Sequence, residues 1–260
     1  MTDYVLHHLG PFEVPGLRPR LVRVYTPPHP ARGPAPVLYM FDGQNLFDDE
    51  PSYAGGWHLH KTARSLWKKH GRAPVIVGID HGGEARIEEL APWPPERSGG
   101  RTDALLDWIG ATLAPRIQGE FRVSDAPEHV AVGGSSLGGL AALYAHFRNP
   151  ERFGMALAMS PSLWVAGGQV FTYLAERAKP WTSRIYLDAG GLEADGRVLE
   201  AARRLAAELR ARGWDDRSLR VVEARRGAHS EKHWRRRAPG AIEFLFAPQA
   251  RQARRARKRA

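Results

Sequence analysis

His129-Val-Ala-Val-Gly-Gly-Ser-Ser-Leu-Gly-Gly-Leu140 is the stretch of sequence that decides the fold. The apolar, β-branched run at 130–132 predicts a short buried strand, and apolar residues at helical spacing over 137–144 predict a helix. Between them, residues 134–138 make the pattern G-x-S-x-G around Ser136. This pattern is typical of a nucleophile elbow, in which a serine hydroxyl is exposed on a strained strand-to-helix turn. The alternative is a glycine-rich turn that merely joins a strand to a helix.

Strands and helices alternate from residue 37 onward. Strands are predicted at 2–8, 19–25, 37–41, 75–79, 130–132, 153–159, 184–188 and 219–222. Helices are predicted at 57–70, from Thr102 through Leu113, after the elbow, at 196–212 and at 233–247. Pro115 is expected to bend or end the second of these helices, and 81–100 is expected to be a long loop at the rim of the site. The alternation predicts the α/β class, with a central, mostly parallel sheet and helices on both faces.

Length and composition indicate one globular domain over residues 1–250. The chain has 260 residues, of which 43% are hydrophobic and 25% charged. It has no cysteine, which excludes disulfides, thiolate metal sites and a cysteine nucleophile. The sequence offers no apolar run that could span a membrane, and its start lacks the basic and apolar regions of a signal peptide. We therefore expect a cytoplasmic protein with no membrane partner.

The last ten residues, 251–260, form a basic tail. They contain six of the positively charged side chains in a protein whose net charge is +10. One interpretation is weak, non-specific and salt-sensitive binding to a polyanion through this tail. The other, which the absence of interleaved aromatic residues favours, is a disordered, solvated end that specifies no partner.

A serine in an elbow needs a base and an orienting acid, which follow it along the chain in the order acid, then histidine. Glu193 and Asp195 follow the predicted strand 184–188. His229 comes in the loop after the strand 219–222, whereas His233 is expected to belong to the last helix and to lie at the surface. The chain thus carries candidates for both roles in the expected order.

Five blocks of the sequence resemble one known family. Val37-Leu-Tyr-Met-Phe-Asp-Gly-Gln-Asn-Leu-Phe47 is similar to the start of the putative-esterase group of α/β-hydrolases, which includes enterochelin (siderophore) esterases, feruloyl esterases and mycolyltransferases. The other similar blocks are Gly133-Gly-Ser-Ser-Leu-Gly-Gly-Leu-Ala-Ala-Leu-Tyr144 with Asn149-Pro-Glu-Arg-Phe-Gly154, Ser160-Pro-Ser-Leu-Trp164, Asp188-Ala-Gly-Gly-Leu-Glu193, and Gly227-Ala-His229 with Trp234. The resemblance implies an α/β-hydrolase fold and does not cover the basic tail.

Carried over residue by residue, the resemblance implies Ser136 as the nucleophile, His229 as the general base and Glu193 as the acid. Many relatives have aspartate at this acidic position, which leaves Asp195 as the alternative acid. Asp195 also has a structural interpretation, as a cap for the helix 196–212.

The resemblance also implies an oxyanion hole made by the backbone amides of Gln44 and Leu137. Such donors lie close to the position that the oxyanion of an acyl-transfer intermediate occupies. The Asp42-Gly43 pair before Gln44 has a second interpretation, as an ordinary turn.

Aromatic and basic residues in the predicted loops suggest a substrate pocket. Trp57, Trp93 and Trp164 could stack on an aromatic acyl or alcohol group, or could equally pack in the core and rim. Arg86 matches an arginine-containing loop of the relatives and could bind an acidic group of the substrate. Its alternative is an ion pair with Glu88 or Glu89 that fixes the loop.

These residues predict a serine carboxylic-ester hydrolase that acts through an acyl-enzyme on a small or aromatic ester. The expected partner is a small-molecule ester, and no metal or organic cofactor is expected. An acyltransferase or thioesterase with the same triad is the alternative within enzymes. A non-catalytic binding protein on a hydrolase scaffold is the alternative from another class, and the presence of all three candidate triad residues argues against it.

Overall fold

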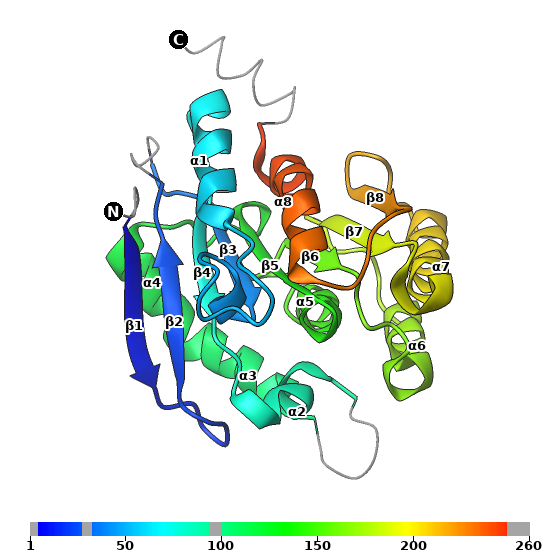
Figure 1. Cartoon of the computed structure of the whole chain (residues 1–260), viewed down its shortest axis with the longest axis horizontal. Coiled ribbons are helices and arrows are strands. Elements are labelled where there is room, and N and C mark those ends of the chain that lie inside the picture. The colour runs from blue at the N-terminus through cyan, green and yellow to red at the C-terminus, as the bar shows by residue number, and fades with distance from the viewer. Residues whose placement is uncertain (1–4, 28–32, 94–99, 249–260) are drawn as a thin grey trace.

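A computed structural model describes residues 5–27, 33–93 and 100–248 of the chain. The basic tail predicted at 251–260 lies outside the described residues. The central feature is an eight-stranded sheet in the order β1-β2-β4-β3-β5-β6-β7-β8 (Figure 1). Its strands are β1 (Leu6–Phe12), β2 (Arg20–Tyr25), β3 (Val37–Phe41), β4 (Val75–Ile79), β5 (Val130–Ser135), β6 (Met155–Met159), β7 (Arg184–Gly190) and β8 (Leu219–Ala224).

The sheet is mostly parallel, as the sequence predicts. Strand β2 runs antiparallel to both of its neighbours, and every other pair of neighbouring strands is parallel. Because the parallel strands β3 and β5 to β8 end at the same edge, the loops that follow them meet there. Those loops carry all the candidate triad residues.

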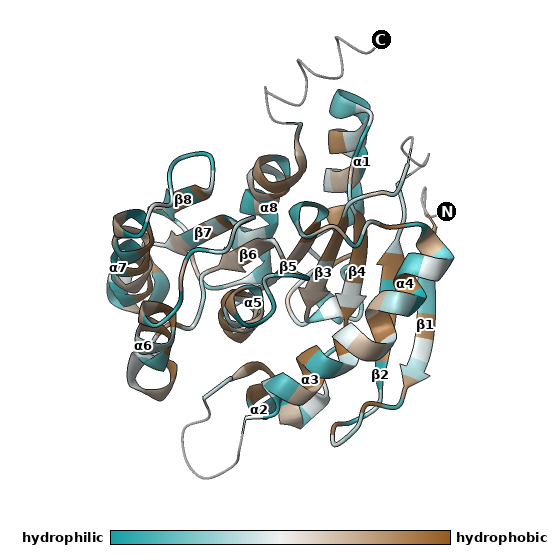
Figure 2. Ribbon diagram, turned by 180° about the vertical axis from the view of Figure 1, so that it is seen from behind, coloured by the Kyte–Doolittle hydropathy of each residue, from teal (hydrophilic) through white to brown (hydrophobic). Residues whose placement is uncertain are grey.

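Helices cover both faces of the sheet, which confirms the predicted class (Figure 1). They are α1 (Leu59–His70), α2 (Arg86–Leu90), α3 (Thr102–Trp108), α4 (Ala114–Phe121), α5 (Leu137–Arg148), α6 (Gln169–Ala175), α7 (Arg197–Ala211) and α8 (Glu231–Phe246). In β3, Leu38 and Met40 pack with α1 and α8, whereas Tyr39 and Phe41 pack with α3, α4 and α5. The central strands are therefore apolar on both sides, and Figure 2 shows them as the hydrophobic middle of the molecule.

Three predicted elements differ from the structure. The first strand, predicted at 2–8, runs over Leu6–Phe12, and residues 2–4 lie outside the described residues. It is a partly exposed edge strand, so hydrophobic alternation does not fix its position. The helix that starts at Thr102 continues past Pro115 to Phe121. Pro115 follows a π-helical segment and lies at the start of α4, where a missing amide donor is tolerated. The segment 81–100 is also not all loop, because it contains α2.

His146 is a fully buried histidine near the end of α5. Its Nδ1 lies 2.6 Å from the carbonyl oxygen of Phe153, so it donates there, and its Nε2 lies 2.8 Å from Ser183 Oγ. The Ser183 hydroxyl in turn accepts a hydrogen bond from Trp214 Nε1. This chain of hydrogen bonds suits a neutral imidazole, and burial lowers the pKa of His146 to about 4 despite the nearby Phe153 carbonyl.

We expect His146 to make the fold sensitive to mild acid. The unfolded chain takes up the histidine proton near the ordinary pKa of 6.5, whereas the folded chain resists it until about 4. Stability should therefore be lost as the pH falls from 6.5 towards 4, by up to about 3 kcal/mol from this group. Urea unfolding of the wild type and of His146→Gln at several pH values measures how the free energy of unfolding depends on pH. The variant should be less stable near neutrality but lose less on acidification, and equal losses in both proteins would refute the assignment.

Candidate active site

Ser136 occupies the sharp turn between β5 and α5. Its backbone has φ 56° and ψ −122°, a conformation that is strained for a residue with a side chain. The turn depends on Gly134, because a Cβ atom there would lie 2.7 Å from the backbone carbon of Gly138. The strain and the close packing are those of a nucleophile elbow. Ser136 is thus held at the carboxyl edge of the sheet with its side chain in a cavity.

His229 and Glu193 come together at the same edge. Glu193 begins the turn after β7, and His229 lies in the loop between β8 and α8. Nδ1 of His229 lies 2.8 Å from Oε2 of Glu193. The Glu193 side chain is fully buried, while the His229 side chain is 37% exposed. The pair therefore presents an imidazole to the cavity and hides the acid behind it.

The surroundings of Glu193 fix its charge state. Burial raises the pKa of its carboxyl group, but hydrogen bonds from His229 and Ser160 lower it by more, so the pKa lies below its ordinary value. An ionised Glu193 accepts a hydrogen bond from the Nδ1–H group of His229. In the neutral imidazole the lone pair then lies on Nε2, which is the atom free to act as a base.

Ser160, at the end of β6, is the residue that positions Glu193. Its hydroxyl donates to Oε1 of Glu193 at 2.7 Å and accepts hydrogen bonds from Trp234 Nε1 at 3.0 Å and Arg237 Nη2 at 2.9 Å. Its backbone has φ 44°, in the left-handed region. The amide of Gly190 also donates to Glu193 Oε1, at 2.9 Å. These contacts leave the acid one orientation, with Oε2 toward His229.

Asp188 lies inside β7 and makes no hydrogen bond to His229 among the described residues. Its carboxylate pairs with Arg237, whose Nε lies 2.9 Å from Oδ2, and it accepts the amide of Ser160. Burial raises the pKa of Asp188, and the ion pair with Arg237 opposes that effect. Asp188 thus helps to anchor the arginine that supports Ser160.

In this structure the hydroxyl of Ser136 bonds to Ser162. The two Oγ atoms are 3.2 Å apart, and the Ser162 amide donates to the Ser136 carbonyl. Within the described residues no hydrogen bond joins Ser136 to His229. Hydrogen bonds between a catalytic nucleophile and its base are often long or poorly aligned until substrate binds.

Gln44 and Leu137 lie at the starts of two helices beside the elbow. Gln44 is in the 3₁₀ helix η1 (Gly43–Asn45) after β3, and Leu137 is the first residue of α5. Amides in the first turn of a helix lack partners within the helix, so both positions suit anion binding. Asp42, just before η1, has φ 58°, in the left-handed region, and its carboxylate pairs with Arg86. The backbone conformation and the ion pair distinguish this turn from an ordinary one.

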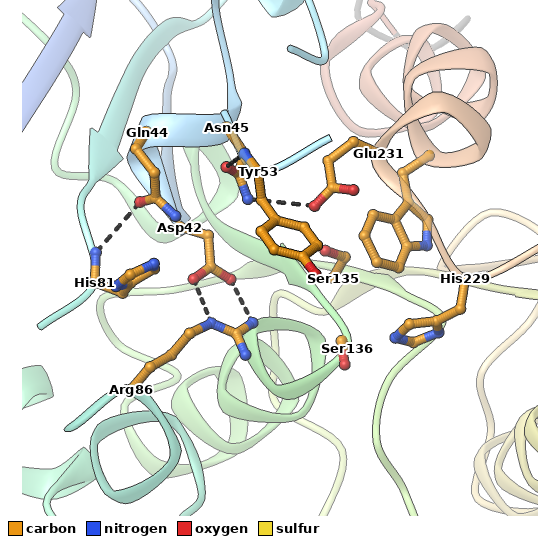
Figure 3. A pocket seen from close by; sticks show the side chains of 11 residues that line it. Asp42, Gln44, Asn45, Tyr53, His81, Arg86, Ser135, Ser136, His229 and Glu231 are labelled. Atoms are coloured by element: carbon orange, nitrogen blue, oxygen red, sulfur yellow. Dashed lines mark hydrogen bonds and ion pairs between the residues drawn. The ribbon is translucent and has the colours of Figure 1, made fainter. Parts of the chain in front are cut away.

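A cavity of about 340 Å³ lies above Ser136 (Figure 3). Most of the residues that line it are polar or charged, and Tyr53 and Trp234 add two aromatic rings. The lining residues are Asp42, Gln44, Asn45, Tyr53, His81, Arg86, Ser135, Ser136, His229, Glu231 and Trp234. The cavity thus contains the candidate nucleophile, the candidate base, one candidate oxyanion residue and several unpredicted polar groups.

The three tryptophans suggested for the pocket do not line the cavity, and the alternative of core or rim packing holds for Trp57 and Trp93. Trp57 is 3% exposed and packs behind Trp234, with ring centroids 5.8 Å apart. Trp93 packs against Tyr144 and Tyr173, and Trp164 is 54% exposed; neither is part of the cavity lining. Their loops are near the site, but packing of each ring decides whether it reaches the cavity.

Arg86 does line the cavity, but its predicted alternative partners are wrong. Its Nε and Nη2 atoms donate to the two carboxylate oxygens of Asp42, at 2.6 and 2.7 Å. Glu89 instead forms a buried ion pair with Arg20, and Glu88 pairs with Arg101. Arg86 therefore ties α2 to the turn that leads into η1.

Asp195 has neither of its two suggested roles in this structure. It is exposed, has φ 56°, and makes no side-chain cap, because Gly196 occupies the N-cap position of α7. Glu193, and not Asp195, makes the contact with His229. His233 lies within α8 and outside the cavity lining, as expected.

Sequence reasoning missed several residues of the site. Ser162 and Ser160 belong to the block after β6, which was noted for its family resemblance alone. Asn45, Tyr53, His81 and Glu231 line the cavity without having been named as candidates. A usable signal existed for some of them, since polar residues that follow parallel strands collect at one edge of the sheet.

The described residues hold no group of three or more histidine, aspartate or glutamate side chains arranged to bind a metal ion. In the same part of the chain, no helix combines the length and apolarity that crossing a bilayer requires.

Comparison with known proteins identifies the family. Residues 17–245 match the family model described as Putative esterase. The chain belongs to this esterase family. Its eight-stranded sheet and helices are those of an α/β-hydrolase, and the structure of the siderophore hydrolase EstA from Aspergillus nidulans matches it with a TM-score of 0.72. That match covers 94% of each chain at 23% identity, which shows the fold.

Two related esterases are similar in sequence to this chain over shorter regions. Siderophore triacetylfusarinine C esterase from Aspergillus fumigatus is 34% identical over 159 residues, which cover 56% of this chain and 52% of that protein. Iron(III) enterobactin esterase from Dickeya dadantii is 32% identical over 183 residues, which cover 62% of this chain and 37% of that protein. The aligned regions thus span about half or less of these relatives.

Proposed function

We propose that this esterase-family protein is a serine carboxylic-ester hydrolase that forms an acyl-enzyme on Ser136. The observation that carries the proposal is the 2.8 Å contact between His229 Nδ1 and the buried carboxylate of Glu193. This contact directs Nε2 toward the cavity that also contains Ser136. A strained elbow serine, a cavity-facing imidazole and a buried acid form the set that acyl transfer requires.

In the first half of the reaction, Nε2 of His229 takes the proton of Ser136 as its oxygen attacks the ester carbonyl. The resulting imidazolium is stabilised by Glu193, and the oxyanion accepts hydrogen bonds from the amides of Gln44 and Leu137. The imidazolium then returns the proton to the departing alcohol. In the second half, water gives a proton to His229 as it attacks the acyl-enzyme, and the imidazolium returns that proton to the Ser136 oxygen as the acid leaves.

The size of the cavity suits a small ester or one arm of a larger ester. Its volume of about 340 Å³ is at the lower end for ligand pockets. Tyr53 and Trp234 offer aromatic surface for an aromatic acyl group. The relatives named above are siderophore esterases, so a siderophore-type ester belongs among the candidate substrates.

Product analysis on a panel of esters tests the proposed reaction. Acetyl, butyryl, feruloyl and siderophore-type esters, with a thioester for comparison, are incubated with and without an added alcohol acceptor. We expect free acid as the main product for at least one oxygen ester. Preferential transfer to the acceptor, or turnover of the thioester alone, would replace the hydrolase with an acyltransferase or thioesterase. Absence of all turnover with retained ligand binding would favour a binding protein.

A further inference from the structure

Glu231 is an acidic residue of the cavity that the reaction above does not use. It is the first residue of α8, two positions after His229, and it is 7% exposed. Its carboxylate borders the cavity beside Asn45, on the wall opposite Arg86 (Figure 3). A ligand that fills the cavity would therefore meet this carboxylate.

Glu231 differs from the other buried acids of the described chain in having no basic partner. Glu89 pairs with Arg20, Asp188 with Arg237, Asp42 with Arg86 and Glu193 with His229. Glu231 accepts one hydrogen bond, from the neutral side-chain amide of Asn45, at the long distance of 3.4 Å. Within the described residues it forms no ion pair. A buried carboxylate usually has a cationic partner, because its desolvation is costly.

The position at the start of α8 explains part of this arrangement. An acidic side chain in the first turn is favoured by the helix dipole, by less than about 1 kcal/mol at most such sites. That effect does not require the carboxylate to face a cavity. The cavity itself has surplus negative charge, since two carboxylates, Asp42 and Glu231, line it together with one guanidinium. Arg86 bonds directly to Asp42 and acts on Glu231 only through space, so one negative charge remains without a bonded partner.

From this surplus we infer that the esters preferred by this protein carry a protonated amino group, which binds Glu231. The inference rests on the proposed function and specifies its substrate class. A carboxylate that borders a cavity needs hydrogen-bond donors, which water or a ligand can supply. A neutral ester expels that water without replacing its hydrogen bonds, whereas an ammonium N–H donates to Glu231 and neutralises it. Glu231 is therefore a specificity-determining residue.

Two isosteric pairs of esters test the inference. On the alcohol side, 2-(dimethylamino)ethyl butyrate is compared with 3-methylbutyl butyrate. On the acyl side, ethyl 4-(dimethylamino)butyrate is compared with ethyl 5-methylhexanoate. Each amine is protonated at pH 7 and matches the shape of its neutral partner. Hydrolysis is followed by titration of the released acid, and the ratio of kcat/KM for charged over neutral ester is measured for each pair.

The wild type should prefer the charged ester in at least one pair. Glu231→Gln keeps an acceptor for Asn45 and removes the charge, so this ratio should fall about tenfold, mainly through KM. Glu200→Gln removes a charge from the exposed surface of α7 and should leave the ratio unchanged. An equal loss for both esters in Glu231→Gln would mean a structural role and overturn the inference. No preference in the wild type would also overturn it.

Binding separates this inference from the proposed function. Titration calorimetry with the same esters is performed on Ser136→Ala and on the double variant Ser136→Ala, Glu231→Gln. Tighter binding of the charged ester, lost in the double variant, would support the inference even if the wild type hydrolysed no ester. Hydrolysis by the wild type without any charge-dependent binding would support the proposed function and overturn the inference.

Discussion

Ser136→Ala should lower kcat for a short p-nitrophenyl ester by at least ~10⁴-fold, as removal of a nucleophile does in other serine enzymes. The variant lacks the oxygen that attacks the ester, so the remaining rate reflects binding and oxyanion stabilisation. Alanine fits the site, because the hydroxyl makes one 3.2 Å hydrogen bond to Ser162. The measurement is steady-state hydrolysis, with circular dichroism to verify folding.

Ser135→Ala is the matched control for the nucleophile. Ser135 is the adjacent residue, lies at the end of β5 and also lines the cavity. Its side chain is not on the strained turn, so we expect a much smaller effect. Should Ser135→Ala be the inactive variant and Ser136→Ala remain active, the nucleophile would be Ser135.

Glu193→Gln should lower kcat by up to ~10⁴-fold. The amide oxygen can still accept from Ser160 and Gly190, but the amide nitrogen then faces Nδ1 of His229 and donates to it. The neutral imidazole consequently carries its proton on Nε2, which cannot accept the proton of Ser136. The loss should appear in kcat for every ester, whatever its charge.

Asp195→Asn is the control for the acid. Asp195 is exposed and is two residues from Glu193 in the same turn. The variant should keep nearly full activity and a nearly unchanged melting temperature, since the structure gives Asp195 no cap to lose. Loss of activity in Asp195→Asn, with Glu193→Gln active, would transfer the orienting role to Asp195.

Local sequence patterns were sufficient to predict the elements that build the site. Strands β3 and β4 are apolar at every position, and their predicted bounds agree with the structure. Glycines around Ser136 are required because the turn brings two backbones together, so the elbow is visible as spacing. His229 and Glu193 follow strands whose order along the chain fixes where they meet. Local sequence therefore contained this part of the site.

Contacts between distant segments could not be predicted in the same way. The partner of Arg86 is Asp42, which is 44 residues away along the chain. The sequence suggested Glu88 or Glu89 because both are close to Arg86 in the chain. Ser160 joins Glu193, which follows β7, to Trp234 and Arg237, which both lie in α8. Such side-chain networks depend on how α8 packs on the sheet, which periodicity does not determine.

The burial of the tryptophans was likewise not predictable from local sequence. Trp57 and Trp164 both lie next to loops of the site, yet one is buried behind Trp234 and the other is exposed. A large aromatic side chain is common in both settings. Glu231 shows the reverse case, since a charged residue at a helix start is ordinary in sequence, and only its burial beside the cavity makes it informative.

Covalent labelling tests the central claim, that Ser136 is the residue acylated during turnover, most directly. A p-nitrophenyl alkylphosphonate transfers its phosphonyl group to an activated serine, and mass spectrometry of the intact protein and its peptides locates the group. We expect one phosphonyl group per chain, on Ser136, with no labelling of Ser136→Ala and slower labelling of Glu193→Gln. A label on another residue, or equal labelling of Ser136→Ala, would contradict the account.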